Sequence, residues 1–187
     1  MSKNEIYTGK PKTAAGGVYV AATTVTGPVD AATALPDGFE PLGRVNEDGL
    51  SRTIDRSTTG WKDWSGSIFR TVTTEHTVKY SLVFLEATLP VLTEVFGEDN
   101  VTQDGTLITV RGNASDRTDR SWVFEMADGD AGIREYVPAG QIVVAAAETV
   151  FNTEAPISFA VEIEAHEDED GQKFYTYLES DAFAATA

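Results

Sequence analysis

Few residues of this chain are of the types that perform catalysis or hold metals. The sequence has two histidines, His76 and His166, and no cysteine, so thiolate metal sites and disulfides are excluded. Neither histidine stands at the spacing of a zinc site or of a nucleophile–histidine–acid triad. No Gly-rich phosphate loop, dinucleotide-binding motif or G-x-S-x-G elbow is present. These residue types favour a protein that is not an enzyme and that uses no cofactor.

Carboxylates are the one abundant reactive group, and two uses of them stay open. Paired acids hydrolyse glycosidic bonds, but an acidic β-protein offers many such pairs by chance. The acidic run at 167–170, before Gly171, would attract Ca²⁺, although it lacks the alternating ligand spacing of a calcium loop. The alternative is a solvated hairpin tip whose charges keep a sheet edge from pairing.

Charge excludes one class of partner. The chain of 187 residues has a net charge of −16, which argues against direct binding to nucleic-acid phosphates. The first twelve residues are locally basic, with Lys3, Lys10 and Lys12, whereas residues 135–187 are strongly acidic. A basic arm and an acidic end would allow head-to-tail self-association; the alternative is a solvated acidic surface. With no signal peptide and no apolar run long enough to cross a membrane, we expect synthesis in a cytoplasm and no membrane insertion.

The elements that position these residues are organised around residues 67–97. Even positions from Ile68 to Phe84 are mostly apolar and odd positions are polar, which predicts a strand with one buried face. A short helix follows, with Thr88 as its cap, Pro90 in its first turn and Gly97 at its end. About twenty residues of strand would span roughly 65 Å, more than a compact domain needs for its own core.

The rest of the chain is divided into short strands by turn signals. Residues 1–17 are predicted to be an arm, 46–66 a long inter-strand loop and 180–187 a loose tail, all in one domain. Asp104-Gly105 predicts a hairpin, Pro138-Ala139-Gly140 a turn, and residues 157–177 a hairpin around the acidic tip. About ten strands and one helix predict a mainly β fold, a β-sandwich or barrel with one short flanking α-helix.

Two tryptophans, Trp61 and Trp64, fall in the predicted loop. A polar loop is a costly place for large aromatic side chains unless something covers them. They either fold back on the core of this domain or anchor an interface, where tryptophan is enriched.

The stretch from Val45 to Glu86 resembles the major tail tube proteins of long-tailed, non-contractile bacteriophages. The phrases that carry the resemblance are VNEDGLSRTIDRSTTGWKDWSG, FRTVTTEHTVKYSLVFLEA and the FGEDNV that follows the helix. Downstream, YVPAG at 136–140 and the acidic stretch 157–177 also look like that family. These phrases are structural and carry no catalytic signature.

The resemblance implies a fold shared in outline with type VI secretion tube proteins. It implies stacked, hexameric rings that form a virion tail tube, assembled in the host cytoplasm on a tape measure protein and bounded by tail-tip and tail-terminator proteins. DNA would pass through the lumen without specific binding. The arm and the loop would then bridge subunits, which makes contact candidates of Trp61, Lys62, Trp64, Lys10 and Lys12. The polar side of the long strand would line the lumen through Thr71, Thr73, Glu75, Thr77 and Lys79.

Two other functions compete with the tube. One is a different virion β-protein, such as a capsid decoration or tail-terminator subunit. The other is a monomeric β-sandwich binding module, which would show aromatic residues along one exposed strand face. The nearest such cluster is Phe174, Tyr175 and Tyr177, in which Phe174 and Tyr175 are expected on opposite faces.

Overall fold

The computed structural model describes residues 6–14, 16–113, 117–145, 149, 151 and 153–184. Strands dominate it, as the mainly β prediction requires. In chain order the strands are β1 (Lys10–Pro11), β2 (Val18–Ala22), β3 (Glu40–Pro41), β4 (Ser51–Lys62), β5 (Ile68–Phe84), β6 (Val101–Asp104), β7 (Leu107–Val110), β8 (Arg120–Asp128), β9 (Ala131–Ala145), β10 (Phe159–His166) and β11 (Tyr175–Glu179). The helices are α1 (Leu89–Phe96), a 3₁₀ turn (Glu98–Asn100) and α2 (Asp181–Ala184).

One antiparallel sheet forms the body and curls on itself. Its order is β3-β2-β8-β9-β10-β5-β4, with β1 also paired to β8 and β11 to β9. Although β9 and β10 separate β5 from β8, Tyr80 of β5 stacks on Phe124 of β8 with ring centroids 5.3 Å apart. The segment 40–46 links the two sides, because Leu42 N donates to Val18 O and Asn46 N donates to Val83 O, both at 2.9 Å.

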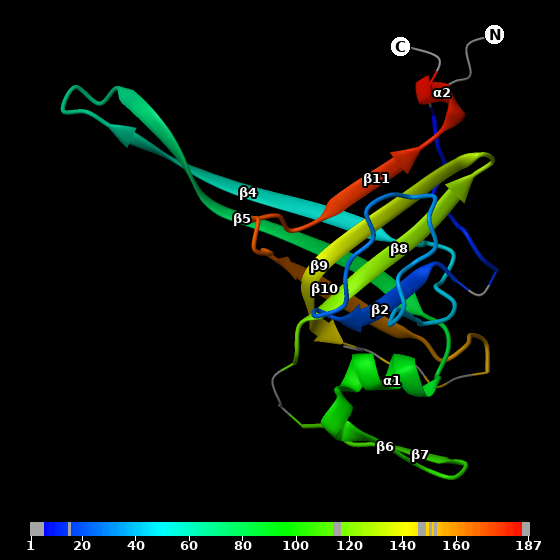
Figure 1. Cartoon of the computed structure of the whole chain (residues 1–187). Helices are drawn as coiled ribbons and strands as arrows, with labels where there is room; N and C mark the ends of the chain where they lie inside the picture. The colour runs from blue at the N-terminus through cyan, green and yellow to red at the C-terminus, as the bar shows by residue number, and fades with distance from the viewer. Residues whose placement is uncertain are drawn as a thin grey trace.

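The core lies inside this curl and is closed at one end by α1 (Figure 1). Alternation in β10 and the second half of β5 supplies the inward side chains, because every second residue faces the same way. In α1, Val91 and Val95 are completely buried and Pro90 occupies the first turn, as predicted. The largest buried apolar side chains are Trp122, Tyr80, Phe84, Phe124, Leu42 and Ile163.

Strands β4 and β5 form a hairpin that projects far from the body (Figure 1). The prediction of a long loop at 46–66 is therefore wrong, since twelve of these residues form β4. Strand β4 escapes sequence recognition because it is exposed almost throughout and shows no apolar alternation. The predicted long strand is confirmed as the seventeen-residue β5, but its even-numbered face is buried only from Val78 onward.

Other predictions meet mixed outcomes. The hairpin at Asp104-Gly105 is confirmed as β6–β7. The prediction of a turn at 138–140 is wrong, because β9 runs through these residues. The register between β8 and β9 shifts opposite Arg120–Trp122, and this shift accommodates Pro138, which has no N–H to donate. The prediction of a hairpin at 157–177 is also wrong. Strands β10 and β11 do not pair with each other but occupy successive stretches of the same β9 edge.

The two ends of the chain are more ordered than the predicted arm and tail. Lys10 and Pro11 pair with β8, and Tyr7 packs edge-on against Phe183 of α2 with ring centroids 6.2 Å apart. Residues 1–5, 15 and 185–187 of these predictions lie outside the described residues.

Candidate functional site

The β4–β5 hairpin is the candidate site, because its outer part is folded but covered by nothing. From Ile68 to Thr77, β5 pairs with no strand other than β4 in the described chain. Large apolar side chains stand exposed on this part, including Ile54, Trp61, Trp64, Ile68 and Phe69. Exposed apolar surface of this kind is a common feature of protein interaction sites, so this part of the hairpin is the candidate interface.

Two bulges in β5 set which side chains share a face of the hairpin. Ser57 faces Glu75 but Thr58 faces Thr73, so Thr74 is an extra residue in β5. Because side chains alternate along a strand, the extra residue exchanges the faces of all positions before it. A second shift, between Trp61 opposite Arg70 and Lys62 opposite Ile68, leaves Phe69 as the extra residue.

Side-chain contacts agree with this assignment of faces. Arg56 donates to Thr73 Oγ1 from Nε at 3.2 Å and from Nη2 at 2.9 Å, which places both on one face. On the other face the Arg70 guanidinium lies over the Trp61 ring, 5.4 Å from its centroid. We call the face of Glu75, Thr77 and Lys79 the open face, since it continues onto the outer surface of the sheet, and the other the core-side face.

The five predicted lumen residues do not share a face, so that part of the prediction is wrong. Glu75, Thr77 and Lys79 lie on the open face, whereas the bulge at Thr74 puts Thr71 and Thr73 on the core-side face. No signal in the sequence marks this bulge, because Thr73 and Thr74 suit either face of an exposed strand.

The open face is acidic and continues from the hairpin onto β10. Glu162 and Glu164 lie beside Ser81 and Lys79 in the register and share their face. Lys79 Nζ donates to Glu162 Oε1 at 2.8 Å, and this hydrogen bond raises the pKa of the Lys79 ammonium. In β4, β5 and β10 this face has more carboxylates than cations: Asp55, Glu75, Glu162 and Glu164 against Arg70 and Lys79.

The base of the hairpin is anchored to the body by a buried carboxylate. Glu135 of β9 accepts from Tyr80 Oη at 2.6 Å, from Thr176 Oγ1 at 2.6 Å and from Arg52 of β4. Burial, followed by the hydrogen bond to Glu135, raises the pKa of the Tyr80 hydroxyl. The Arg52 guanidinium also lies 4.5 Å from the centre of the Phe174 ring. These contacts fix where β4 leaves the body.

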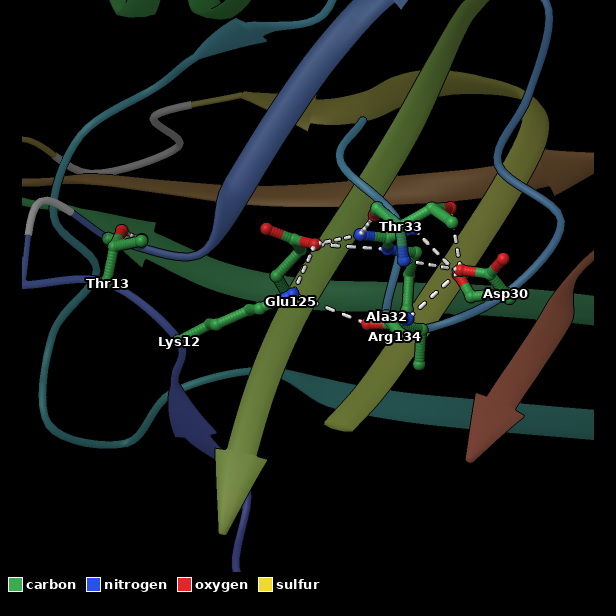
Figure 2. Close-up of polar contacts among 9 residues, drawn as sticks. Lys12, Thr13, Asp30, Ala32, Thr33, Glu125 and Arg134 are labelled. Carbon is green, nitrogen blue, oxygen red and sulfur yellow. Dashed lines mark hydrogen bonds and ion pairs between the residues drawn. The ribbon is translucent and has the colours of Figure 1, made fainter. Parts of the chain in front are cut away.

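A second buried charge cluster, missed by the sequence reasoning, lies on the opposite side of β8 and β9. Arg134 is almost completely buried and bonds Glu125 from Nε at 3.0 Å and from Nη2 (Figure 2). Its remaining donors reach Asp30 O at 2.7 Å and Thr33 O at 2.8 Å, which pins the loop between β2 and β3. Each of the three guanidinium nitrogens donates at least one hydrogen bond within the chain, so we interpret the cluster as a structural clamp.

The predicted contact residues are placed at both ends of the molecule. Trp61 and Lys62 end β4, and Trp64 lies in the tip turn. Lys10 is exposed on β1. Lys12 is engaged within its own chain, since its ammonium lies 3.5 Å from Glu125 and donates to Ala31 O at 3.3 Å (Figure 2).

The acidic tip at 167–170 is arranged as a turn. Asp168 Oδ1 accepts from the backbone N–H groups of Asp170 at 3.0 Å and Gln172 at 2.8 Å, while Oδ2 accepts from Tyr175 Oη at 2.8 Å. No cluster of three or more potential metal ligands occurs in the described ranges. No helix of the described chain is long and apolar enough to cross a membrane.

Comparisons with known proteins address the whole chain. Two solved structures resemble it at 9% identity: the tube-terminating cap of the anti-feeding prophage (TM-score 0.47, covering 95% of this chain and 96% of that one) and a chain of the sheath–tube complex of an extracellular contractile injection system in its extended state (TM-score 0.46, covering 88% of each). A search of curated protein sequences finds no significant match. The profile of the family described as phage tail tube protein matches residues 7–187. The chain therefore belongs to the phage tail tube protein family.

Proposed function

We propose that copies of this chain build the tail tube by joining their open sheets edge to edge into rings. The observation that carries the proposal is a pair of free edges on the sheet β4-β5-β10-β9. In the part of the chain that the structure describes, no strand pairs with the outer edge of β4. Residues 141–145 of β9 pair with β10 on one side, while the pairing of β9 with β8 stops at Gly140.

The two free edges are compatible in direction. Neighbours in the sheet are antiparallel throughout, so β4 and β9 run in opposite directions. Pairing β4 of one subunit with 141–145 of the next would continue the antiparallel ladder around a ring. Such closure also removes edges that would otherwise aggregate. Six subunits per ring, as the family resemblance implies, is part of the proposal.

The open face is the side we assign to the lumen. Apart from Trp61, its exposed side chains on β4 and the outer part of β5 are mainly polar, and its charges are net negative, which would repel the phosphate backbone and let DNA pass without specific binding. Glu75, Thr77 and Lys79 remain lumen candidates, while Thr71 and Thr73 would face the outer layer of the tube. The core-side face of the hairpin, which includes Ile54, would lie on a neighbouring subunit, and the exposed Phe69 at the second bulge would be buried there as well.

The remaining parts of the proposal concern partners and role. The protein is a structural component of the virion tail, and we assign it no catalytic role. A tape measure protein would occupy the lumen during assembly in the host cytoplasm, and tail-tip and tail-terminator proteins would bound the tube.

Electron microscopy of the purified protein at increasing concentration tests the proposal. We expect straight tubes of uniform bore. Single rings that never stack would indicate a terminator-like role instead. A protein that stays monomeric by light scattering at every concentration, with and without tail-tip proteins, contradicts the tube.

Cysteine cross-linking tests the proposed edge pairing, because the native chain has no cysteine. Single cysteines at alternate positions of 51–61 in β4 are combined with Val143→Cys or Val144→Cys. We expect inter-subunit disulfides for pairs in one register of the ladder and none for the same β4 series combined with Thr106→Cys, in the exposed β6–β7 turn.

A further inference from the structure

The tip of the hairpin presents one tryptophan on a well-ordered turn. Trp64 is fully exposed. The turn around it is closed by Asp63 N donating to Ser67 O at 2.9 Å and Gly66 N donating to Asp63 O at 3.0 Å. Asp63 Oδ1 also accepts from Ser67 N at 3.0 Å and from Ser65 Oγ at 2.5 Å. The backbone of a turn held in this way loses little conformational entropy when the tip binds, and tryptophan is enriched among interface hot spots.

A cavity of matching character lies at the other end of β4. It has a volume of about 250 Å³. Leu50, Leu82, Leu85, Phe124 and Met126 form much of its wall. Gly9, Pro11, Ala14, Gly16, Gly17 and Val18 also line it. We call this the root cavity, because Gly49 and Leu50 lead directly into β4.

Trp64 cannot enter the root cavity of its own subunit. The twelve residues of β4 separate the two, and at about 3.3 Å per residue they hold them on the order of 40 Å apart. The hairpin extends away from the body along this whole length (Figure 1). Any filling of the cavity by this side chain must therefore occur between two molecules.

Charges beside the two surfaces are complementary. Lys62 precedes the tip turn and is exposed. The turn at 46–49, part of which lines the root cavity, carries the exposed carboxylates Glu47 and Asp48. The cation at the cavity, Arg44, already has Glu86 as an ion-pair partner at 3.9 Å. A tip that approaches the cavity thus brings Lys62 toward two carboxylates, while the carboxylate of Asp63 is engaged by Ser65 and Ser67 of its own turn.

We propose that Trp64 of one subunit inserts into the root cavity of a second subunit, with Lys62 beside Glu47 and Asp48. The inference rests on the proposed tube and names one contact within it. Because tip and cavity lie at opposite ends of β4, the contact is head-to-tail and does not close on the same pair of molecules. It joins subunits along the direction of the hairpin, and so links successive rings.

Variants at the tip supply the first test. We expect Trp64→Ala to raise the protein concentration needed for tube formation at least about tenfold, as loss of a hot-spot residue does, and Trp64→Phe to raise it much less. Melting of the unassembled protein should be unchanged in both, since the side chain touches nothing in the monomer. Equal assembly of wild type and Trp64→Ala overturns the inference.

The cavity is tested separately with free indole. The probe is titrated into the Trp64→Ala protein below its assembly concentration, and methyl signals of Leu50, Leu82 and Met126 are followed by NMR. We expect saturable shifts at these residues and none in the β6–β7 hairpin. No saturable shift up to the solubility limit of indole contradicts a tryptophan-binding cavity.

Cross-linking separates failure of this contact from failure of the tube. In assembled protein, Trp64→Cys combined with Ala14→Cys, at the exposed rim of the cavity, should give a disulfide ladder. The control, Trp64→Cys with Thr106→Cys, should not. If tubes form but the two ladders are equal, the contact is wrong and the tube stands. If wild-type protein forms no tubes, the proposed function itself fails.

Discussion

The body and the outer hairpin belong to one sheet but are stabilised in different ways. In the body, side chains from β5, β8 and β10 meet inside the curl, and Trp122 and Tyr80 are completely buried. In the outer hairpin both faces of β4 meet solvent, and the two strands rely on their shared ladder and a few cross-strand contacts. A two-stranded ribbon alone is marginally stable in water. This difference supports the proposal that contacts with other subunits stabilise the outer hairpin.

Removing a core side chain should have the largest effect on the isolated subunit. Trp122 fills the body and its indole N–H donates to Gly140 O at 3.0 Å. We expect Trp122→Ala to lower the free energy of unfolding by about 3–5 kcal/mol, because it leaves a cavity and removes the hydrogen bond to Gly140 O. Urea denaturation followed by circular dichroism measures this. A loss below 1 kcal/mol would contradict the assigned core.

Breaking the buried ion pair between Arg134 and Glu125 should cause the second-largest loss of stability. Arg134→Met leaves Glu125 as a buried carboxylate with Lys12 as its remaining cationic partner, and we expect a loss of about 3 kcal/mol. The double variant Arg134→Met with Glu125→Leu removes both charges and should recover part of that loss. Thermal unfolding of the wild type, the single and the double variant compares them. A double variant less stable than the single one would argue against an electrostatic cause.

Removing an exposed apolar side chain of the hairpin should have the opposite result: little effect on monomer stability and a strong effect on assembly. Phe69 is 66% exposed, so Phe69→Ala should change monomer stability by no more than about 0.5 kcal/mol. Assembly, by contrast, should weaken strongly, because the proposed tube buries this side chain. Denaturation and sedimentation of the same samples give the two readings. Thr59→Ala, an exposed polar site on the open face of β4, is the control and should affect both weakly. A large loss of monomer stability in Phe69→Ala would mean that the hairpin is packed in the monomer.

The smallest effect should be confined to the tip turn. Hydrogen bonds from the Ser65 hydroxyl and the Ser67 N–H lower the pKa of Asp63. A carboxylate with a lowered pKa stabilises its turn above its ordinary pKa, and the contribution is lost as the pH falls through the lowered value. At neutral pH, Asp63→Asn should mimic that loss: amide exchange of Gly66 and Ser67 should become faster while the melting temperature stays unchanged. Asp55→Asn, within β4, should leave these amides unaffected.

The contrast between the two regions also explains how far sequence reasoning reached. Alternation predicts the stretch from Val78 to Phe84 well, because one face of it is buried in its own subunit. The same reasoning reads residues 51–62 as loop, because a strand with no buried face in the monomer shows no such pattern. The exchange of faces at Thr74 also leaves no signal in the sequence, since Thr73 and Thr74 are both exposed.

Contacts between residues far apart in the chain could not be predicted from the sequence for a different reason. The acidic tip predicts a turn, but nothing local says that β10 and β11 both pair with β9. Arg134 and Glu125 are charged residues within apolar strands, and the covering loop that makes their burial possible comes about a hundred residues earlier. The sequence alone indicates the tryptophans as contact candidates, and this remains a prediction. The root cavity could not be predicted, because segments from four separate parts of the chain line it.

Hydrogen–deuterium exchange of β4, compared between isolated subunits and assembled particles, tests the central claim most directly. In the isolated subunit the amides that point to the outer edge of β4 should exchange rapidly, whereas those of β8 and β10 should be protected. In the assembled particle the same β4 amides should become protected, with little change in the body. Rapid exchange along β4 in well-formed tubes would contradict the claim that this hairpin is completed by its neighbours.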